Sequence, residues 1–177
     1  MSKSPKIIVL IGYMGSGKSV VADRLANRLD LSFVDLDDFL EEKTDKSISQ
    51  IFEEHGELRF RNMERQVLHE LLEETSNKVL SLGGGTPCYY DNMDIVLQKA
   101  TNVIFLDVTV NVLVDRLWKE KNHRPVIAHL ETKESLAEFV GKHLFERRPF
   151  YRKASTIIAS KPTINIGRAS ISTNRWW

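Results

Sequence analysis

The chain has little cysteine, no long hydrophobic run and almost no net charge. Cys88 is the single cysteine among 177 residues, so no disulfide can form within the chain and a reducing compartment is expected. The apolar run at 7–11 is too short for the core of a signal peptide or for a membrane span, and the short segment before it is polar. These absences predict a cytoplasmic protein with no membrane partner.

The balance of charges limits the partners further. Lys and Arg number 25 against 24 Asp and Glu, which leaves a net charge of +1 and no general attraction to nucleic acid. A small basic cluster is better explained by a small anionic substrate than by nucleic acid; it consists of Lys142, Arg147, Arg148, Arg152 and Lys153. The five histidines show no spacing typical of metal ligands. The length predicts one domain, and we predict a monomer.

Short apolar segments alternate with helical patterns along the chain. This alternation is typical of an α/β fold with a parallel sheet covered by helices on both faces. The predicted strands are 7–11, 32–35, 78–82, 102–106 and 156–159, and the predicted helices are 18–29, 57–73, 89–99, 109–119 and 133–146. The polar segment 119–132 is predicted to be a mobile loop and a candidate lid. No clear periodicity assigns 161–177.

The most specific motif is a phosphate-binding loop, Gly12-Tyr13-Met14-Gly15-Ser16-Gly17-Lys18-Ser19, which fits G-x-x-x-x-G-K-[ST]. A predicted strand precedes it, and an amphipathic helix follows with Val21, Leu25 and Leu29 on one face. Backbone N–H groups of the loop would surround phosphate oxygens at the positive end of that helix. Lys18 would reach the β- and γ-phosphates and Ser19 would offer a hydroxyl to Mg²⁺. The motif predicts binding of a nucleoside triphosphate.

Acidic residues follow the second predicted strand. Ligands of an open parallel sheet bind beyond the carboxyl ends of its strands, so Asp35 and Asp37 are expected near the phosphates. One of these carboxylates can hold Mg²⁺ through water, and the other can accept a proton from an attacking hydroxyl or orient it. Helix capping is the alternative role, and it is the one that we predict for Asp38.

Three glycines, Gly83, Gly84 and Gly85, follow the third predicted strand. Their backbone N–H groups are open to close approach by a ligand. A flexible turn is the alternative, and the position at the end of a strand favours the ligand.

Several arginines could hold an anionic acceptor. Arg61 precedes Glu64 by three residues, a spacing at which the carboxylate can orient the guanidinium on a helix. Arg124 lies in the candidate lid, and Arg147 and Arg148 stand before Pro149. Each could be a solvated surface charge, but together with the motifs above they indicate an anionic substrate.

Taken together, these residues resemble shikimate kinase. The family's P-loop carries methionine at the position of Met14, and its Asp-x-Asp is matched by Asp35 and Asp37. Further family motifs occur in family order; they are Phe-Arg-x-x-Glu at Phe60, Arg61 and Glu64, the glycine triplet at Gly83–Gly85, Arg-Pro at Arg124 and Pro125, and Arg-x-Pro-x-Tyr at Arg147, Pro149 and Tyr151. The matches extend from residue 12 to about residue 151.

The resemblance implies a three-layer P-loop kinase fold with a five-stranded parallel sheet in the order 2-3-1-4-5. It implies transfer of the γ-phosphoryl group of ATP, with Mg²⁺, to the 3-hydroxyl of shikimate, in chorismate and aromatic amino acid biosynthesis. The acceptor-binding segment would be about 33–73 and the lid about 119–132. Relatives usually end in an amphipathic helix, a pattern that 161–177 lacks.

The resemblance also implies a role for each site residue. Arg61 and Arg147 would hold the carboxylate of shikimate, Glu64 would orient Arg61, and Gly83, Gly84 and Gly85 would line the pocket. Asp37 would bind ring hydroxyls and act as the base, while Ser19 and Asp35 would hold Mg²⁺. Lys18 and Arg124 would neutralise the transferring group, and Arg116 resembles the residue that packs on adenine.

Two other functions remain open from the residues. One is a different small-metabolite kinase of the same architecture, such as a gluconate or nucleoside-monophosphate kinase, since the arginines would also suit a phosphate-bearing acceptor. The other is a P-loop switch that signals to a partner. The Asp-x-Asp and the glycine triplet argue for a hydroxylated carboxylic acid, and no Asp-x-x-Gly typical of switches follows a strand.

Overall fold

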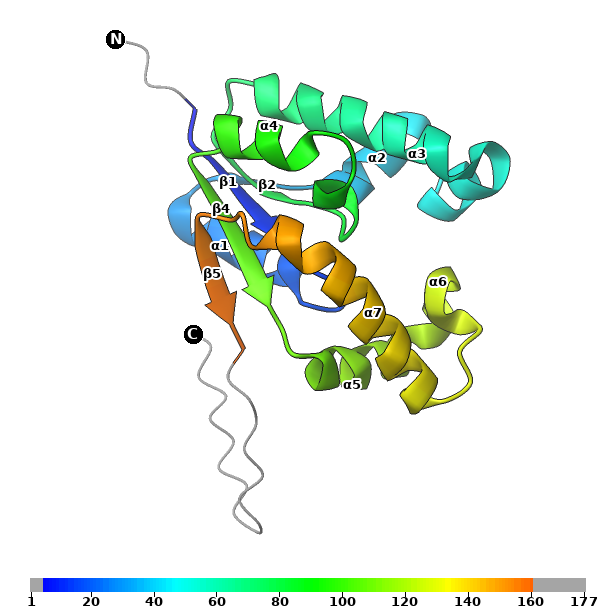
Figure 1. Cartoon of the computed structure of the whole chain (residues 1–177). Helices are drawn as coiled ribbons and strands as arrows, with labels where there is room; N and C mark the ends of the chain where they lie inside the picture. Colours follow the sequence, from blue (N-terminus) through cyan, green and yellow to red (C-terminus); the bar gives the residue numbers. More distant parts are fainter. Residues whose placement is uncertain (1–4, 161–177) are drawn as a thin grey trace.

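A five-stranded parallel sheet forms the centre of the fold in the computed structural model, which describes residues 5–160 without the side chains of residues 123 and 125 (Figure 1). The strand order is β2-β3-β1-β4-β5. The strands are β1 (Ile7–Ile11), β2 (Ser32–Asp35), β3 (Lys78–Ser81), β4 (Asn102–Asp107) and β5 (Thr156–Ala159). The predicted fold class and strand order are confirmed.

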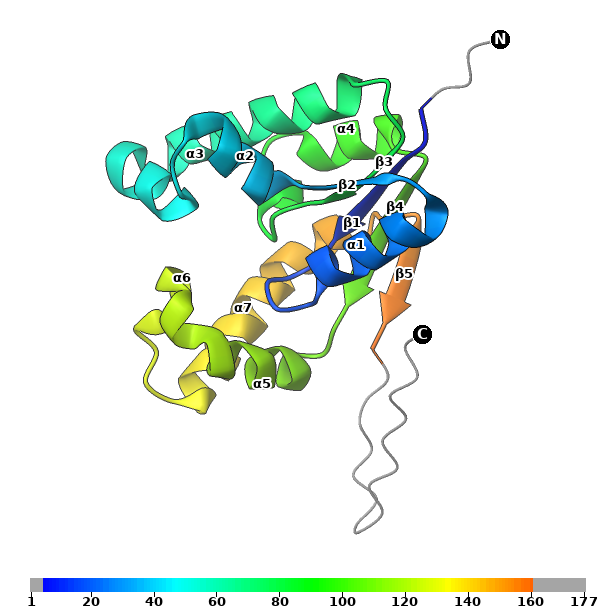
Figure 2. The same ribbon diagram turned by 180° about the vertical axis from the view of Figure 1, so that it is seen from behind.

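Helices cover both faces of this sheet. α1 (Lys18–Leu29) lies against one face, which Figure 2 brings to the front. The other helices are α2 (Leu36–Thr44), α3 (Ile48–Glu73), α4 (Asn92–Lys99), α5 (Val110–Glu120), α6 (Pro125–Ala128) and α7 (Lys133–Tyr151), with the short 3₁₀ turns η1 (Thr86–Cys88) and η2 (Lys121–His123). α4 and α7 lie against the opposite face, and α3 packs beside α4 (Figure 1).

The central strand shows how the sequence forms two cores. All five residues of β1 are buried, as the continuous apolar run predicts for a parallel strand inside a sheet. Successive side chains of a strand point to opposite faces. Ile7, Val9 and Ile11 accordingly join the large core with α3, α4, α5 and α7, while Ile8 and Leu10 join the small core beneath α1.

The buried face of α1 differs from the expectation. Of the three residues predicted on the apolar face, Leu25 is half-buried and packs against the small core, but Val21 and Leu29 are exposed, and Ala22 and Ala26 are buried against the sheet. Alanine also recurs at a spacing of four residues, and its small side chain lets the helix axis approach the strands closely. The prediction was based on the larger apolar side chains, whereas the residues of α1 that are buried most deeply against the sheet are the small alanines.

Helix boundaries follow local capping signals. α3 begins at a capping box in which Ser47 accepts from the N–H of Gln50 and the Gln50 side chain accepts from the N–H of Ser47. Gly56 (φ 74°) breaks α3 into two helical parts, and the prediction found the second part alone. α2 was not predicted, and α7 continues beyond residue 146, through Pro149, to Tyr151.

The segment predicted as a loop, 119–132, contains η2 and α6. Ile127 is fully buried in the large core, and Lys121 Nζ donates to the carbonyl of Leu130 at 2.7 Å. The predicted loop thus contains two short helical turns, and its mobility and its role as a lid stay predictions. The unassigned segment 161–177 lies outside the described residues. Among residues 5–160, no helix is both long and apolar enough to cross a membrane.

Candidate active site

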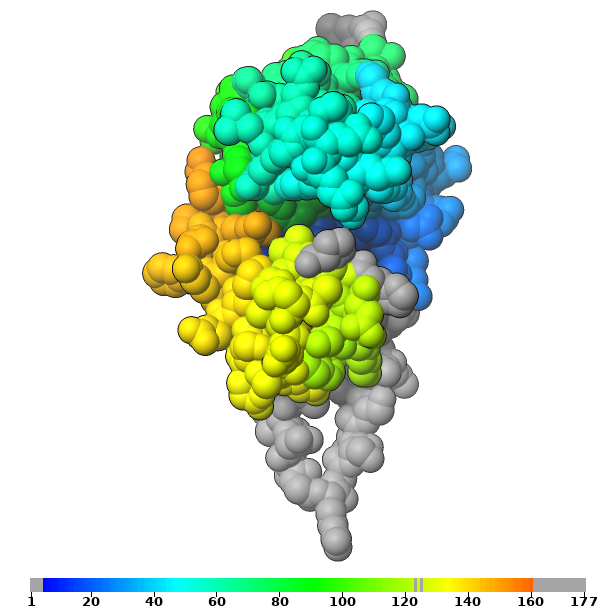
Figure 3. All heavy atoms as spheres, turned by 90° about the vertical axis from the view of Figure 1, so that its right-hand side faces the viewer, coloured from blue at the N-terminus to red at the C-terminus, as the bar shows by residue number. Residues whose placement is uncertain are grey.

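A cavity of about 590 Å³ lies at the carboxyl ends of β1, β2 and β3. Figure 3 shows a crease between α3, in teal, and the segment around α6, in yellow, with the blue N-terminal part of the chain visible at its side. The predicted site residues that line the cavity are Met14, Gly15, Gly17, Lys18, Ser19, Asp35, Asp37, Gly83, Gly84, Arg116 and Arg124. The P-loop and the acidic residues thus open into one space.

The P-loop is held by contacts from inside and outside its own sequence. Gly17 is the N-cap of α1, so Lys18 begins the helix, and its Nζ donates to the carbonyl of Tyr13 at 3.1 Å. Arg116 Nη1 on α5 donates to the carbonyl of Gly15 at 3.0 Å and to that of Ser16 at 3.2 Å. The observed partners of Arg116 are thus P-loop carbonyls, and its contact with adenine stays a prediction.

Burial lowers the pKa of Lys18 to about 8, while the negative charges of Asp37 and Asp35 oppose this shift. A lysine ammonium that has lost its water is attracted strongly to any anion that enters the cavity. The buried ammonium of Lys18 therefore costs free energy in the empty site, and the same loss of water strengthens its attraction to a phosphate.

Asp35 connects the P-loop to the start of α2. Its Oδ2 accepts from Ser19 Oγ at 2.7 Å, and its Oδ1 accepts from the N–H of Asp37 at 3.1 Å as the N-cap of the helix. The predicted capping role of Asp38 is wrong, because Asp38 lies in the first turn and the preceding Asp35 accepts the hydrogen bond instead. Asp38 is exposed at the rim of the cavity.

Asp37 lies near Lys18 of the P-loop and near the Arg61–Glu64 pair of α3. Burial raises the pKa of its carboxyl to about 7, and the negative charges of Asp35 and Glu64 add to the shift, while Lys18 and Arg61 oppose it. A carboxylate with a pKa near neutrality is a stronger proton acceptor than an ordinary aspartate, yet it is still ionised in a large fraction of molecules. This environment suits a general base.

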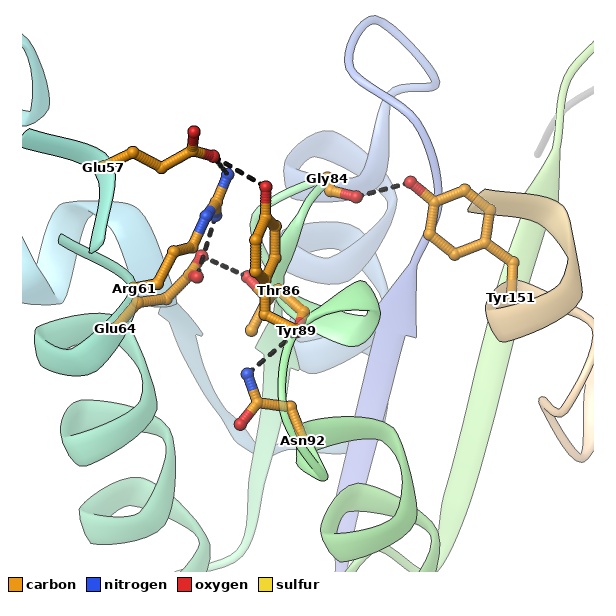
Figure 4. A network of polar contacts seen from close by, with 8 residues as sticks. All are labelled: Glu57, Arg61, Glu64, Gly84, Thr86, Tyr89, Asn92 and Tyr151. Atoms are coloured by element: carbon orange, nitrogen blue, oxygen red, sulfur yellow. Dashed lines mark hydrogen bonds and ion pairs between the residues drawn. The ribbon is translucent and has the colours of Figure 1, made fainter. Parts of the chain in front are cut away.

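Arg61 and Glu64 form the predicted pair on α3, with Arg61 Nη1 donating to Glu64 Oε2 at 2.9 Å (Figure 4). Glu64 is 1% exposed, and its other oxygen accepts from Thr86 Oγ1 at 2.5 Å. The backbone of Thr86 is held in turn by Asn92 Nδ2, which donates to its carbonyl at 2.9 Å. The buried carboxylate is therefore fixed from two sides, and it fixes the guanidinium.

The glycine triplet makes room for these side chains. A Cβ atom at Gly83 would lie 2.8 Å from Asp37 Oδ1, and one at Gly85 would lie 2.8 Å from Arg61 Nη2. A Cβ atom at Gly84 would lie 3.2 Å from the backbone nitrogen of Met14. The triplet lets the Asp37 carboxylate, the Arg61 guanidinium and the P-loop approach one backbone turn. The expected contact of its N–H groups with a ligand stays a prediction.

Arg147 on α7 approaches the P-loop from the opposite side. Its Cζ lies 5.6 Å from the centroid of the Tyr13 ring, and the Tyr13 hydroxyl and His143 Nδ1 are 3.5 Å apart. One turn later, Tyr151 donates from its hydroxyl to the carbonyl of Gly84 at 2.5 Å (Figure 4). α7 thereby contacts both the P-loop and the glycine turn. Its other predicted arginine, Arg148, instead pairs with Asp107 at 2.9 Å.

Arg124 stands at the start of α6 on the candidate lid. Its Nη2 and Nε donate to Glu120 Oε2 at 2.8 and 3.2 Å. Both residues line the cavity, so the guanidinium is near the nucleotide side without contacting the P-loop. Its predicted role in neutralising the transferring group requires a change of partner.

Sequence reasoning missed several residues that support the site. They are Tyr13, Glu57, Thr86, Tyr89 and Asn92. Tyr13 was visible as an aromatic residue inside the P-loop motif, and Thr86 directly follows the glycine triplet. Glu57 precedes Arg61 by four residues on α3, a spacing that could have indicated their ion pair. No spacing rule connects Tyr89 to Arg61, because the fold alone brings these two segments together.

Comparisons with known proteins agree with this geometry. The family model described as shikimate kinase matches residues 14–167. The chain belongs to the shikimate kinase family. Shikimate kinase from Flavobacterium johnsoniae is 42% identical over 153 residues, covering 86% of this chain and 88% of the relative. The relative from Phocaeicola vulgatus is 44% identical over 147 residues, covering 83% of this chain and 82% of its own length.

Solved structures of shikimate kinases share the fold. The crystal structure from Bacteroides thetaiotaomicron has a TM-score of 0.81 and 39% identity, covering 87% of this chain and 86% of that one. The structure from Acinetobacter baumannii, described as a complex with shikimate, has a TM-score of 0.77 and 32% identity, covering 90% and 86%. In this member of the shikimate kinase family, all predicted site residues except Gly12 lie within residues 14–167, the range that the family model matches.

Proposed function

We propose that the chain transfers the γ-phosphoryl group of ATP to the 3-hydroxyl of shikimate, a step in chorismate and aromatic amino acid biosynthesis. Membership of the shikimate kinase family supports this reaction. The observation that carries the residue roles is the position of Asp37, whose pKa responds to Lys18 on the nucleotide side and to Arg61 and Glu64 on the other. A base at this position would lie between the two substrates, which supports the assignment.

The acceptor carboxylate would bind Arg61 and Arg147, which approach the glycine turn and the P-loop from α3 and α7. Glu64 accepts from Nη1 of Arg61 and Glu57 Oε1 lies 3.6 Å from Nη2, and the remaining hydrogen-bonding capacity of the guanidinium would serve the carboxylate of the acceptor. Arginine is suited to this role because its planar donors match a carboxylate. The backbone of Gly83–Gly85 would line the pocket between the two arginines.

In the proposed reaction, Asp37 accepts the proton of the 3-hydroxyl as the oxygen forms a bond to the γ-phosphorus. The bond from that phosphorus to the β–γ bridging oxygen breaks, and ADP leaves with the electron pair. Lys18 would stabilise the charge that spreads over the phosphoryl oxygens, and Arg124 would join it after leaving Glu120. Arg116 would hold the P-loop in place while the base of the nucleotide lies beside it.

The residues at the P-loop fit Mg²⁺ as cofactor. Ser19 Oγ and Asp35 Oδ2 lie 2.7 Å apart at the cavity wall, and Ser81 Oγ lies 3.5 Å from Ser19 Oγ. Magnesium prefers hard oxygen ligands and keeps several of its waters, so one hydroxyl and one carboxylate suffice. When bound, the ion would neutralise charge on the β- and γ-phosphates.

The direct test measures ADP release in a coupled assay with Mg²⁺-ATP and shikimate, gluconate, AMP or no acceptor. Turnover that depends on shikimate alone is expected. Turnover with gluconate or AMP instead would contradict the acceptor assignment, and hydrolysis without any acceptor would favour a nucleotide switch. A cytoplasmic location, a monomeric state and the absence of nucleic-acid and membrane partners stay predictions from the sequence.

A further inference from the structure

Tyr89 covers one face of the Arg61 guanidinium. Arg61 Cζ lies 4.1 Å from the centroid of the Tyr89 ring, a distance typical of a close cation–π contact. Tyr89 follows directly after η1, so its ring comes from the turn that continues the glycine triplet, whereas Arg61 comes from α3 (Figure 4). The two residues meet through the fold alone, and the predicted roles of the site leave Tyr89 unused.

The hydroxyl of Tyr89 fixes the ring in this position. It donates to Glu57 Oε1 at 2.6 Å, and the same oxygen lies 3.6 Å from Arg61 Nη2. Burial and the hydrogen bond to Glu57 both raise the pKa of the Tyr89 phenol, so it stays a neutral donor. Tyr89, Glu57 and Arg61 therefore contact one another in a closed triangle (Figure 4).

Other contacts complete the enclosure of the guanidinium. Glu64 holds the Nη1 edge at 2.9 Å, and the Phe60 ring centroid lies 4.9 Å from Cζ. The backbone of Gly85 lies so close that its Cβ, if present, would be 2.8 Å from Nη2. The Arg61 side chain is only 11% exposed. A long, flexible side chain is thus held in one orientation before any substrate arrives.

We propose that Tyr89 is a positioning residue for the acceptor carboxylate, acting through the guanidinium plane of Arg61. The proposal rests on the proposed function, in which Arg61 binds that carboxylate. Immobilising arginine costs conformational entropy, and a site that has already met this cost binds its ligand more tightly. Because the carboxylate is remote from the transferred phosphoryl group, its contact acts equally in ground and transition states. Loss of positioning should therefore change KM more than kcat.

The chain provides a matched control in the next residue. Tyr90 lies over Arg65, with Cζ 5.4 Å from its ring centroid, and donates from its hydroxyl to Asn62 Oδ1 at 3.1 Å. This second tyrosine–arginine pair joins the same two segments, but the side chain that meets the glycine turn at Gly85 is Arg61 and not Arg65. A general structural role of an aromatic ring between η1 and α3 would be shared by both tyrosines.

The test compares Tyr89→Leu, Tyr89→Phe and Tyr90→Leu by steady-state kinetics and by titration calorimetry with shikimate. Tyr89→Leu is expected to raise the KM and Kd for shikimate about ten-fold, with kcat and the KM for ATP within about two-fold. Tyr89→Phe keeps the ring and should recover most of the affinity, while Tyr90→Leu should match the parent chain. Tyr89→Met, also without a ring, serves if the leucine variant does not fold. An unchanged shikimate affinity in the ringless variants would overturn the proposal.

A double-mutant cycle separates this inference from the proposed function. If Tyr89 acts through Arg61, Tyr89→Leu should have little further effect on shikimate affinity in an Arg61→Ala background. A full additional loss there would show that Tyr89 acts elsewhere and would contradict the inference, even though Arg61 itself mattered. If Arg61→Ala alone left shikimate affinity unchanged, the assigned role of Arg61 would fail, and the positioning role with it.

Discussion

At the scale of single residues, Asp37 carries two opposing demands. The proposed catalysis needs a carboxylate close to Lys18 and Arg61, but folding places that carboxylate among the like charges of Asp35 and Glu64 and removes much of its water. The raised pKa of Asp37 means that the ionised carboxylate is disfavoured in the folded chain, so the ionised form lowers the stability of the fold. Residues that are selected for function are expected to reduce stability in this manner.

Asp37→Asn should therefore reduce turnover and increase stability together. Loss of a general base is expected to lower kcat about 10²- to 10⁴-fold, with ATP binding largely kept. In the absence of ligands and Mg²⁺, the melting temperature should rise by a few degrees, since about 1 kcal/mol corresponds to about 2–4 °C in a chain of this size. Coupled kinetics and thermal unfolding measure the two effects.

The stability gain should depend on pH with a definite sign. The pKa of Asp37 is about 7 in the folded chain against a reference of 3.8, so between these values the folded state binds more protons than the unfolded state. Stability of the parent chain then falls as pH rises through this window, and the advantage of Asn should be larger at pH 8 than at pH 5. Asp23→Asn, at an exposed position of α1, is the control and should change neither turnover nor stability. Near-normal turnover of Asp37→Asn would exclude Asp37 as the base.

Residue types were easier to predict than their partners. The P-loop, Asp35, Asp37 and the Arg61–Glu64 pair follow from spacing on one strand end or one helix. Tyr89 and Thr86 could not be predicted as partners of Arg61 and Glu64, because sequence distances of more than twenty residues carry no geometric information by themselves. The fold supplies these contacts, and the sequence supplies only the chemistry that they use.

At the scale of elements, strands were located better than helices. Short apolar segments between helical patterns mark the strands, so 7–11, 32–35 and 156–159 were predicted with the observed bounds, although only the first of these three strands is fully buried. Helix ends depend on single hydrogen bonds. The cap at Asp35 starts α2, which is only nine residues long, and Gly56 interrupts α3, so both escaped a search for periodicity.

The glycine turn after β3 yields a prediction that belongs to this scale. Gly85→Ala places a methyl group 2.8 Å from Arg61 Nη2, inside any normal contact, so the guanidinium or the turn must move. We expect the KM for shikimate to rise about ten-fold or more, with a much smaller change in the KM for ATP, measured by steady-state kinetics. An unaltered shikimate KM would show that the turn adapts and that the close approach is not required.

A glycine elsewhere serves as the control for this change. Gly141 lies inside α7, and a Cβ atom there would meet no other atom within 4 Å. Gly141→Ala should leave both KM values unchanged and raise stability by up to about 1 kcal/mol, because alanine favours the helical backbone. The comparison separates the effect of adding a methyl group from the effect of adding it against Arg61.

At the scale of the whole molecule, the parallel sheet explains why distant motifs share one cavity. All strands end at the same edge, so the P-loop after β1, the acidic pair after β2 and the glycine turn after β3 are neighbours despite their separation in sequence. α3 brings Arg61 from one side and α7 brings Arg147 from the other. In the proposed function, nucleotide and acceptor would thus be held by different elements around a common centre.

Because different elements would hold the two ligands, we predict that each ligand stabilises the folded chain independently of the other. A ligand at about 100 times its dissociation constant stabilises a folded chain by about 2.7 kcal/mol, which corresponds to roughly 5–11 °C here. Shikimate and Mg²⁺-ADP should each raise the melting temperature of the parent chain, and Arg61→Ala should lose most of the shikimate effect while it keeps the nucleotide effect. Arg65→Ala, which removes an ion pair with Asp91 outside the cavity, should keep both. Thermal unfolding with each ligand alone decides the matter, because loss of the nucleotide response in Arg61→Ala with an intact shikimate response would place the acceptor elsewhere in the fold.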